Sequence, residues 1–164
     1  MNLGIKRFIK DSRGAVLVEA AIVLPFMLLL LGGAAEFGRF FYTYNTLAKA
    51  TRVSARYISS QCVSTGRLSS ARNLAVYGNA AGTGTSILPN LTASNVVLCS
   101  PEPDGTCRPL ESDDTPETIT VRIDNYTYQP IIPIGPLEDL VGFEIVPSTT
   151  IKYLVTTPIV GGCS

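Results

Sequence analysis

Glu19 is the first residue whose chemistry needs an explanation, because it is the only charged side chain between Ala15 and Ala35. A charge at the centre of a bilayer costs about 2.5–3.5 kcal/mol and marks function by default. Glu19 lies only about 7–8 Å along a helix from Gly14, so its cost would be smaller. Glu19 therefore either extends to the cytoplasmic membrane interface and has no function, or gains a partner within the membrane.

Pro25 lies in the middle of the same apolar segment. Proline removes one helical hydrogen bond and can kink a helix, and neighbouring helices or local adjustments must compensate. A helix alone in lipid gains nothing from Glu19 and Pro25, whereas a helix packed against other copies can use both. We therefore assign both residues to assembly, with Glu19 setting the axial register of the packed helices.

The cysteines are the second group of reactive side chains, and they number four: Cys62, Cys99, Cys107 and Cys163. An even count in a domain expected to face an oxidising compartment predicts disulfides. The favoured pair, Cys99 with Cys107, brackets a turn-rich loop, which leaves Cys62 with Cys163. A four-thiolate zinc site is the alternative, but no C-x-x-C spacing supports it, so no metal site is predicted.

Other chemistry is poorly represented, because the chain contains no histidine. This removes Ser-His-Asp and Cys-His catalysis and most zinc sites, so we expect no enzyme, no catalytic residue and no cofactor. The turn-rich loop is acidic, which allows a calcium site, a patch that docks on basic helices of neighbouring subunits, or merely a solvated loop. Its acids are Glu102, Asp104, Glu111, Asp113, Asp114 and Glu117.

The elements that carry these residues differ in charge. Residues 1–14 form a basic leader of net charge +3, residues 36–72 carry net +5, and residues 79–164 carry net −7. Residues 15–35 are long enough to cross a hydrocarbon core, and the leader should stay in the cytoplasm. A cleaved secretory signal is the alternative, because small residues follow the apolar segment. No nucleic-acid partner is expected.

Helical periodicity continues past the apolar segment and predicts an amphipathic extension over residues 36–77. We expect one helix from about Ala15 to about Ser60, which could run on to Tyr77 with a break near Gly66. The residues expected to pack this helix recur at three- and four-residue steps: Phe37, Phe40, Phe41, Tyr44 and Leu47.

The last part of the chain reads as a linker, residues 78–94, and a β-rich head, residues 95–164. Three or four antiparallel strands should pack against the long helix, with a possible short helix over residues 137–141. The fold class is therefore α+β, with a long N-terminal helix followed by a small antiparallel β-sheet head. The strand signals are residues 95–99, 118–128, 143–146 and 149–156.

The tract G-A-V-L-V-E, from Gly14 to Glu19, resembles a prepilin-peptidase site: a basic leader, glycine, four mostly apolar residues and glutamate. V-E-A-A-I-V-L-P, L-L-L-L-G-G-A-A-E-F-G-R and the basic run to A-R-Y resemble the TadE-like family, the minor pseudopilins of tight-adherence (type IVb) pilus systems. The resemblance covers about residues 13–60. Ala20 departs from it, because pilin-type members commonly carry an aromatic residue after the glutamate.

The resemblance implies cleavage between Gly14 and Ala15 by prepilin peptidase. The new amine on Ala15, cationic near neutral pH, could then pair with Glu19 of a neighbouring subunit. The implied partners are that peptidase, other pilin or pseudopilin subunits and the inner-membrane assembly platform. The implied location is the bacterial inner membrane, single-pass with the head in the periplasm, or an extracellular pilus after assembly. The alternative is a permanently anchored assembly factor or adhesin whose periplasmic head binds a ligand.

Overall fold

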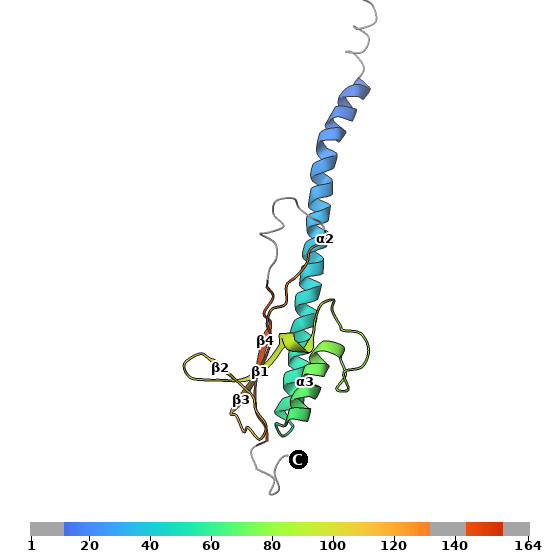
Figure 1. Ribbon diagram of the computed structural model, residues 1–164. Helices are drawn as coiled ribbons and strands as arrows, with labels where there is room; N and C mark the ends of the chain where they lie inside the picture. The colour runs from blue at the N-terminus through green and yellow to red at the C-terminus, as the bar shows by residue number, and fades with distance from the viewer. Residues whose placement is uncertain (1–11, 132–143, 156–164) are drawn as a thin grey trace, which may run out of the picture. The chain divides into compact units, whose positions relative to one another are not determined.

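The computed structural model describes residues 12–131 and 144–155. The chain divides into two compact units, residues 1–39 and residues 40–164. One helix, α2 (Ser12–Ser59), supplies the described part of the first unit and contributes its last twenty residues to the second (Figure 1). The predicted α+β class is confirmed, because a small antiparallel sheet follows this long helix.

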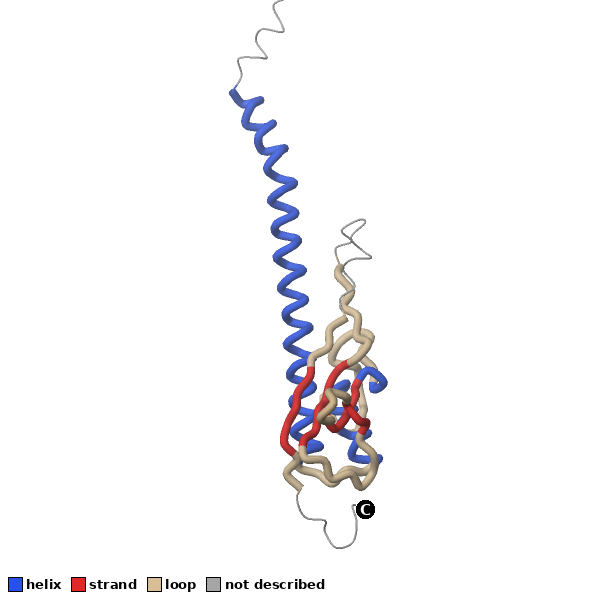
Figure 2. Tube along the Cα trace, turned by 90° about the vertical axis from the view of Figure 1, so that its left-hand side faces the viewer, coloured by secondary structure: helices blue, strands red, loops and turns tan. Residues whose placement is uncertain are grey.

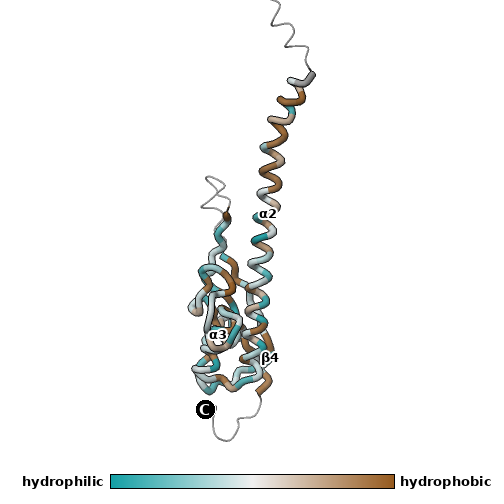
Figure 3. Tube along the Cα trace, turned by 90° about the vertical axis from the view of Figure 1, so that its right-hand side faces the viewer, coloured by the Kyte–Doolittle hydropathy of each residue, from teal (hydrophilic) through white to brown (hydrophobic). Residues whose placement is uncertain are grey.

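The N-terminal half of α2 is rich in leucine and alanine, which are strong helix formers. It is long and apolar enough to cross a membrane, and no other described helix is. Side chains along its apolar stretch are exposed, for example Leu24 at 56% and Leu30 at 73%. Figure 3 shows this stretch as the brown part of the helix. Its surface therefore suits a lipid or helix environment rather than water.

The helix ends at Ser59, and a second helix, α3, covers Thr65–Tyr77. The predicted continuation to Tyr77 is thus found, but the break lies before Gly66, which falls inside α3. Ser64 caps the new helix, and its hydroxyl accepts a hydrogen bond from the Arg67 amide. Gly78 ends α3 with a left-handed φ of 71°.

Four strands form one antiparallel sheet in the order β2-β1-β3-β4. The strands are β1 (Val96–Pro101), β2 (Cys107–Pro109), β3 (Thr118–Ile123) and β4 (Ser148–Lys152). Figure 2 shows the strands beside the C-terminal part of α2. Leu98 lies opposite Val121 in the β1–β3 register, and Ile119 lies opposite Ile151 in the β3–β4 register.

The strand predictions differ from the structure mainly in their ends. β3 stops at Ile123 rather than Tyr128, because Asn125 adopts a left-handed φ of 56° that breaks the extended backbone. Residues 144–146 form no strand, although Glu144 makes an isolated bridge with Thr127. The short helix expected over residues 137–141 lies outside the described residues.

The core lies between the C-terminal part of α2, α3 and the sheet. α2 contributes Leu47 and Ile58, the sheet contributes Leu98 and Ile119, and α3 contributes Val76, all 2% exposed or less. Residues 78–94, expected as a linker, also enter this core, because Leu88 and Leu91 are buried in it. Apolar side chains at both positions anchor the segment.

Candidate assembly interface on the N-terminal helix

Gly14 and Ala15, the predicted cleavage site, lie in the first turn of α2 and are exposed. A Cβ built on Gly14 would meet no atom within 4 Å. Side-chain packing therefore does not require glycine at this position, and a different reason must account for it.

Glu19 is exposed on the helix surface among apolar neighbours such as Val18 and Ile22, which are 62% and 60% exposed. Within residues 12–131 and 144–155 its carboxylate has neither a hydrogen bond nor an ion pair. An uncompensated carboxylate is costly away from water. The site therefore suits an incoming cation or hydrogen-bond donor.

Pro25 lies inside α2, and the helix continues on both sides of it. The missing proline N–H leaves the carbonyl of Ala21, four residues earlier, without its usual helical hydrogen bond. In a membrane such a carbonyl is satisfied by a neighbouring helix or a local adjustment. Glu19 and Pro25 thus leave two polar groups, a carboxylate and a backbone carbonyl, that need partners within the same apolar part of the helix.

The five predicted packing residues divide into two groups. Leu47 is fully buried in the core, and the ring of Phe40 packs edge-on against Tyr128 with centroids 5.5 Å apart. Phe37, Phe41 and Tyr44 remain 45–63% exposed. Leu47 and Phe40 therefore hold the head onto its own helix, whereas the other three present aromatic surface outward.

Two buried hydroxyls fasten α2 to the rest of the head, and sequence reasoning missed both contacts. Ser54 Oγ donates to the carbonyl oxygen of Ala71 in α3 at 2.7 Å, and both residues are fully buried. Thr51 Oγ1 lies 2.9 Å from Thr149 Oγ1 in β4. No pattern in a single sequence identifies the partner of either hydroxyl.

The opposite face of α2 carries three exposed bases, Lys49, Arg52 and Arg56, which we call the basic stripe. Their spacing of three and four residues places them on one side of the helix. In the part of the chain that the structure describes, none of the three side chains has an ion pair or a hydrogen bond.

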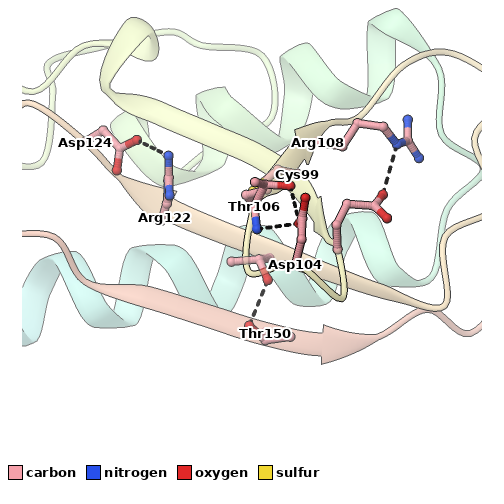
Figure 4. The surroundings of a disulfide bond; sticks show 10 residues. Cys99, Asp104, Thr106, Arg108, Arg122, Asp124 and Thr150 are labelled. Atoms are coloured by element: carbon pink, nitrogen blue, oxygen red, sulfur yellow. Dashed lines mark hydrogen bonds and ion pairs between the residues drawn. A yellow bond between two sulfur atoms is a disulfide. The ribbon is translucent and has the colours of Figure 1, made fainter.

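The structure joins Cys99 to Cys107 in a disulfide, with Cα atoms 5.4 Å apart, as the sequence favoured (Figure 4). The other predicted pair involves Cys163, which lies outside the described residues. The disulfide closes the β1–β2 hairpin. Within the hairpin loop the Asp104 carboxylate accepts hydrogen bonds from the Thr106 hydroxyl and amide, and these lower the pKa of Asp104.

Arg108 organises the acidic loop, because its guanidinium contacts both Glu102 at 3.3 Å and Asp114 at 3.0 Å. The Glu111 amide also donates to the Asp114 carboxylate, and this bond together with Arg108 lowers the pKa of Asp114. Across residues 12–131 and 144–155, no three acids, cysteines or histidines converge in a way that would hold a metal ion.

Taken together, the fold and the helix define a small α+β head carried on a long apolar helix of the kind that anchors a protein in a membrane. The family model described as TadE-like protein matches residues 14–56. The resemblance to the TadE-like family is thereby confirmed over this segment, which contains Gly14, Glu19, Pro25 and the basic stripe. The match points to involvement in Tad pilus assembly and to membrane association with pilus components.

Searches among curated proteins and among solved structures returned no match.

Proposed function

We propose that the protein is a minor pseudopilin that acts in the assembly of a tight-adherence pilus. It is inserted in the bacterial inner membrane with its N-terminus in the cytoplasm and its head in the periplasm. Prepilin peptidase cuts after Gly14, and the mature chain packs through α2 against other pilin or pseudopilin subunits at the assembly platform or in the extracellular fibre. Its work is packing rather than catalysis.

The observation that carries this proposal is Glu19, an exposed carboxylate on an apolar helix that matches the TadE-like model; within the described ranges 12–131 and 144–155 it forms no hydrogen bond or ion pair. Cleavage would leave a cationic amine on Ala15. In a bundle of parallel helices, that amine on one subunit can neutralise Glu19 on the next and fix their axial offset. This pairing matters for assembly, because a charge buried away from water is tolerated only when it has a partner.

The cleavage step is tested by mass spectrometry of the protein from cells that contain the peptidase. We expect a mature chain that begins at Ala15. Gly14→Val should block the cut and leave the leader attached. Gly33→Val is the matched control, because a Cβ at either glycine meets no atom within 4 Å, so the helix has room at both positions.

An intact leader on the wild-type protein in such cells would refute processing. That result would favour the alternative of a permanently anchored assembly factor or adhesin. Equal processing of the Gly14→Val and Gly33→Val proteins would refute the assigned cleavage site.

A further inference from the structure

The head carries both basic and acidic side chains that form no ion pair within the described residues. The basic stripe supplies three positive charges on the outer face of α2. Glu111, Asp113 and Glu117, which we call the acidic end, are exposed, and their carboxylates form no hydrogen bond or ion pair within residues 12–131 and 144–155. By contrast, Glu102 and Asp114 already share Arg108.

The acidic end is fixed just beyond the C-terminus of α2. The Asp113 amide donates to the Val63 carbonyl at 2.8 Å, and the Thr65 amide donates to the Ser112 hydroxyl at 3.2 Å. For Glu117, the Tyr153 amide donates to the Glu117 carbonyl at 3.0 Å, and the Tyr153 hydroxyl donates to the Gln61 carbonyl at 3.1 Å. The acids are thus held by the fold at the level of residues 59–65.

The basic stripe lies before the C-terminus of α2, since Ser59, the last residue of the helix, follows Arg56 by three residues and Lys49 by ten. At about 1.5 Å per helical residue the stripe lies roughly 5–15 Å along the axis from the end of α2, where the acidic end is held. In two parallel copies, as a membrane would orient them, these opposite charges meet when one copy is displaced along the axis by that offset.

We propose that the acidic end of one copy of this chain docks on the basic stripe of a second, parallel copy, displaced along the helix axis by roughly 5–15 Å. The inference rests on the proposed function. Because the copies are parallel and displaced, the contact is heterologous, and a heterologous contact that does not close into a ring continues as an open helical filament. A second copy is the chosen occupant because the same chain carries both complementary charges.

The test is photocrosslinking of the full-length protein in cells that assemble the pilus. A benzophenone amino acid replaces Val53, which is 51% exposed and lies beside the basic stripe. We expect a dimer whose crosslinked peptide in the second copy contains residues 111–117. Charge reversal by Arg52→Glu with Arg56→Glu should reduce this product by roughly fivefold or more, since attraction becomes repulsion.

Two further variants test whether the crosslink depends on the charge of the basic stripe or only on the shape of its side chains. Arg52→Lys with Arg56→Lys keeps the charge and should keep the crosslink. Glu111→Lys with Glu117→Lys should restore the product in the charge-reversed protein; Asp113 is left unchanged because its φ of 69° is tolerated better by aspartate than by lysine. Rescue excludes simple misfolding of the reversed stripe.

The amount of protein in the purified pilus fraction is measured in parallel. Protein that enters pili but crosslinks to lipid, to another protein or to a different surface of its copy overturns the docking inference and leaves the proposed function intact. Protein that crosslinks through residues 111–117 but never enters pili refutes the proposed function and supports the contact.

Discussion

Ser54 in α2 and Ala71 in α3 are joined by a 2.7 Å hydrogen bond between two fully buried residues. This bond fastens the second helix against the first, because the Ser54 hydroxyl satisfies a helical carbonyl that water does not reach. Such contacts make the C-terminal part of α2 an integral part of the head rather than a stalk below it.

Replacing Ser54 with alanine should destabilise the head by about 0.5–1.5 kcal/mol, because one buried hydrogen bond between α2 and α3 is lost while the Ala71 carbonyl keeps its helical bond. Thermal unfolding of the full-length protein in detergent measures the change. Ser60→Ala is the matched control, since the exposed Ser60 hydroxyl bonds only carbonyls of its own helix, and it should shift stability by less than about 0.5 kcal/mol. Equal effects of the two variants would contradict the role given to Ser54.

The outward and inward residues of α2 should separate assembly from stability. Leu47→Ala should cost about 2–5 kcal/mol, because Leu47 is fully buried in the core. Phe41→Ala should change the unfolding midpoint far less, since Phe41 is 49% exposed, yet reduce recovery in the pilus fraction. Unfolding in detergent and quantification of pili give the two readouts, and a Phe41 variant that assembles normally would remove this residue from the interface.

The Cys99–Cys107 disulfide should stabilise the β1–β2 hairpin. Its sequence separation of eight residues closes a short loop, for which the chain-entropy model gives about 2–3 kcal/mol. The double variant Cys99→Ser, Cys107→Ser should therefore unfold at a lower temperature and be cleaved faster by protease within residues 101–107. Protease sensitivity that is unchanged in this loop would show that the hairpin holds without the bond.

The acidic loop should loosen in acid. The pKa of Asp114 is lower in the folded protein than its ordinary value of 3.8, because the Glu111 amide and Arg108 favour the charged form. Its contribution is therefore present above pH 3.8 and is lost as the pH falls through the lower, folded-state pKa. The protection of the Glu111 amide against hydrogen exchange, taken relative to the intrinsic exchange rate at each pH, should fall over that range, and Asp114→Asn should remove most of this pH dependence; an unchanged profile in the variant would assign the effect to other groups.

Much of this architecture could be predicted from the sequence because strong local signals mark it. The apolar run, the three- and four-residue steps through Leu47 and the cysteines around a short loop each depend on neighbours in sequence. The sequence predicts the break between the helices near Gly66, but Ser64 provides the cap, so the helix restarts at Thr65, one residue before the glycine. Glycine alone is a weaker boundary signal than a capping hydroxyl.

Contacts between distant segments could not be predicted in the same way. Tertiary packing brings together Thr51 with Thr149 and Ser54 with Ala71, and such contacts produce no periodic pattern in the sequence. Strand β2, with only three residues, is too short to show alternation. Leu88 and Leu91 belong to a segment whose glycines and threonines suggested a linker, yet two well-placed leucines were enough to bury it.

The proposed pairing of Glu19 between subunits is tested most directly by a neutral side chain of the same size. Glu19→Gln should insert in the membrane in normal amount, because it lowers the cost of the helix in lipid. It should be recovered in the pilus fraction at roughly a tenth of the wild-type level or less, as expected when a buried ion pair loses one partner. Glu19→Asp, which keeps the charge, should recover part of the loss. Recovery of the Glu19→Gln protein in pili at the wild-type level would contradict the pairing of Glu19 between subunits.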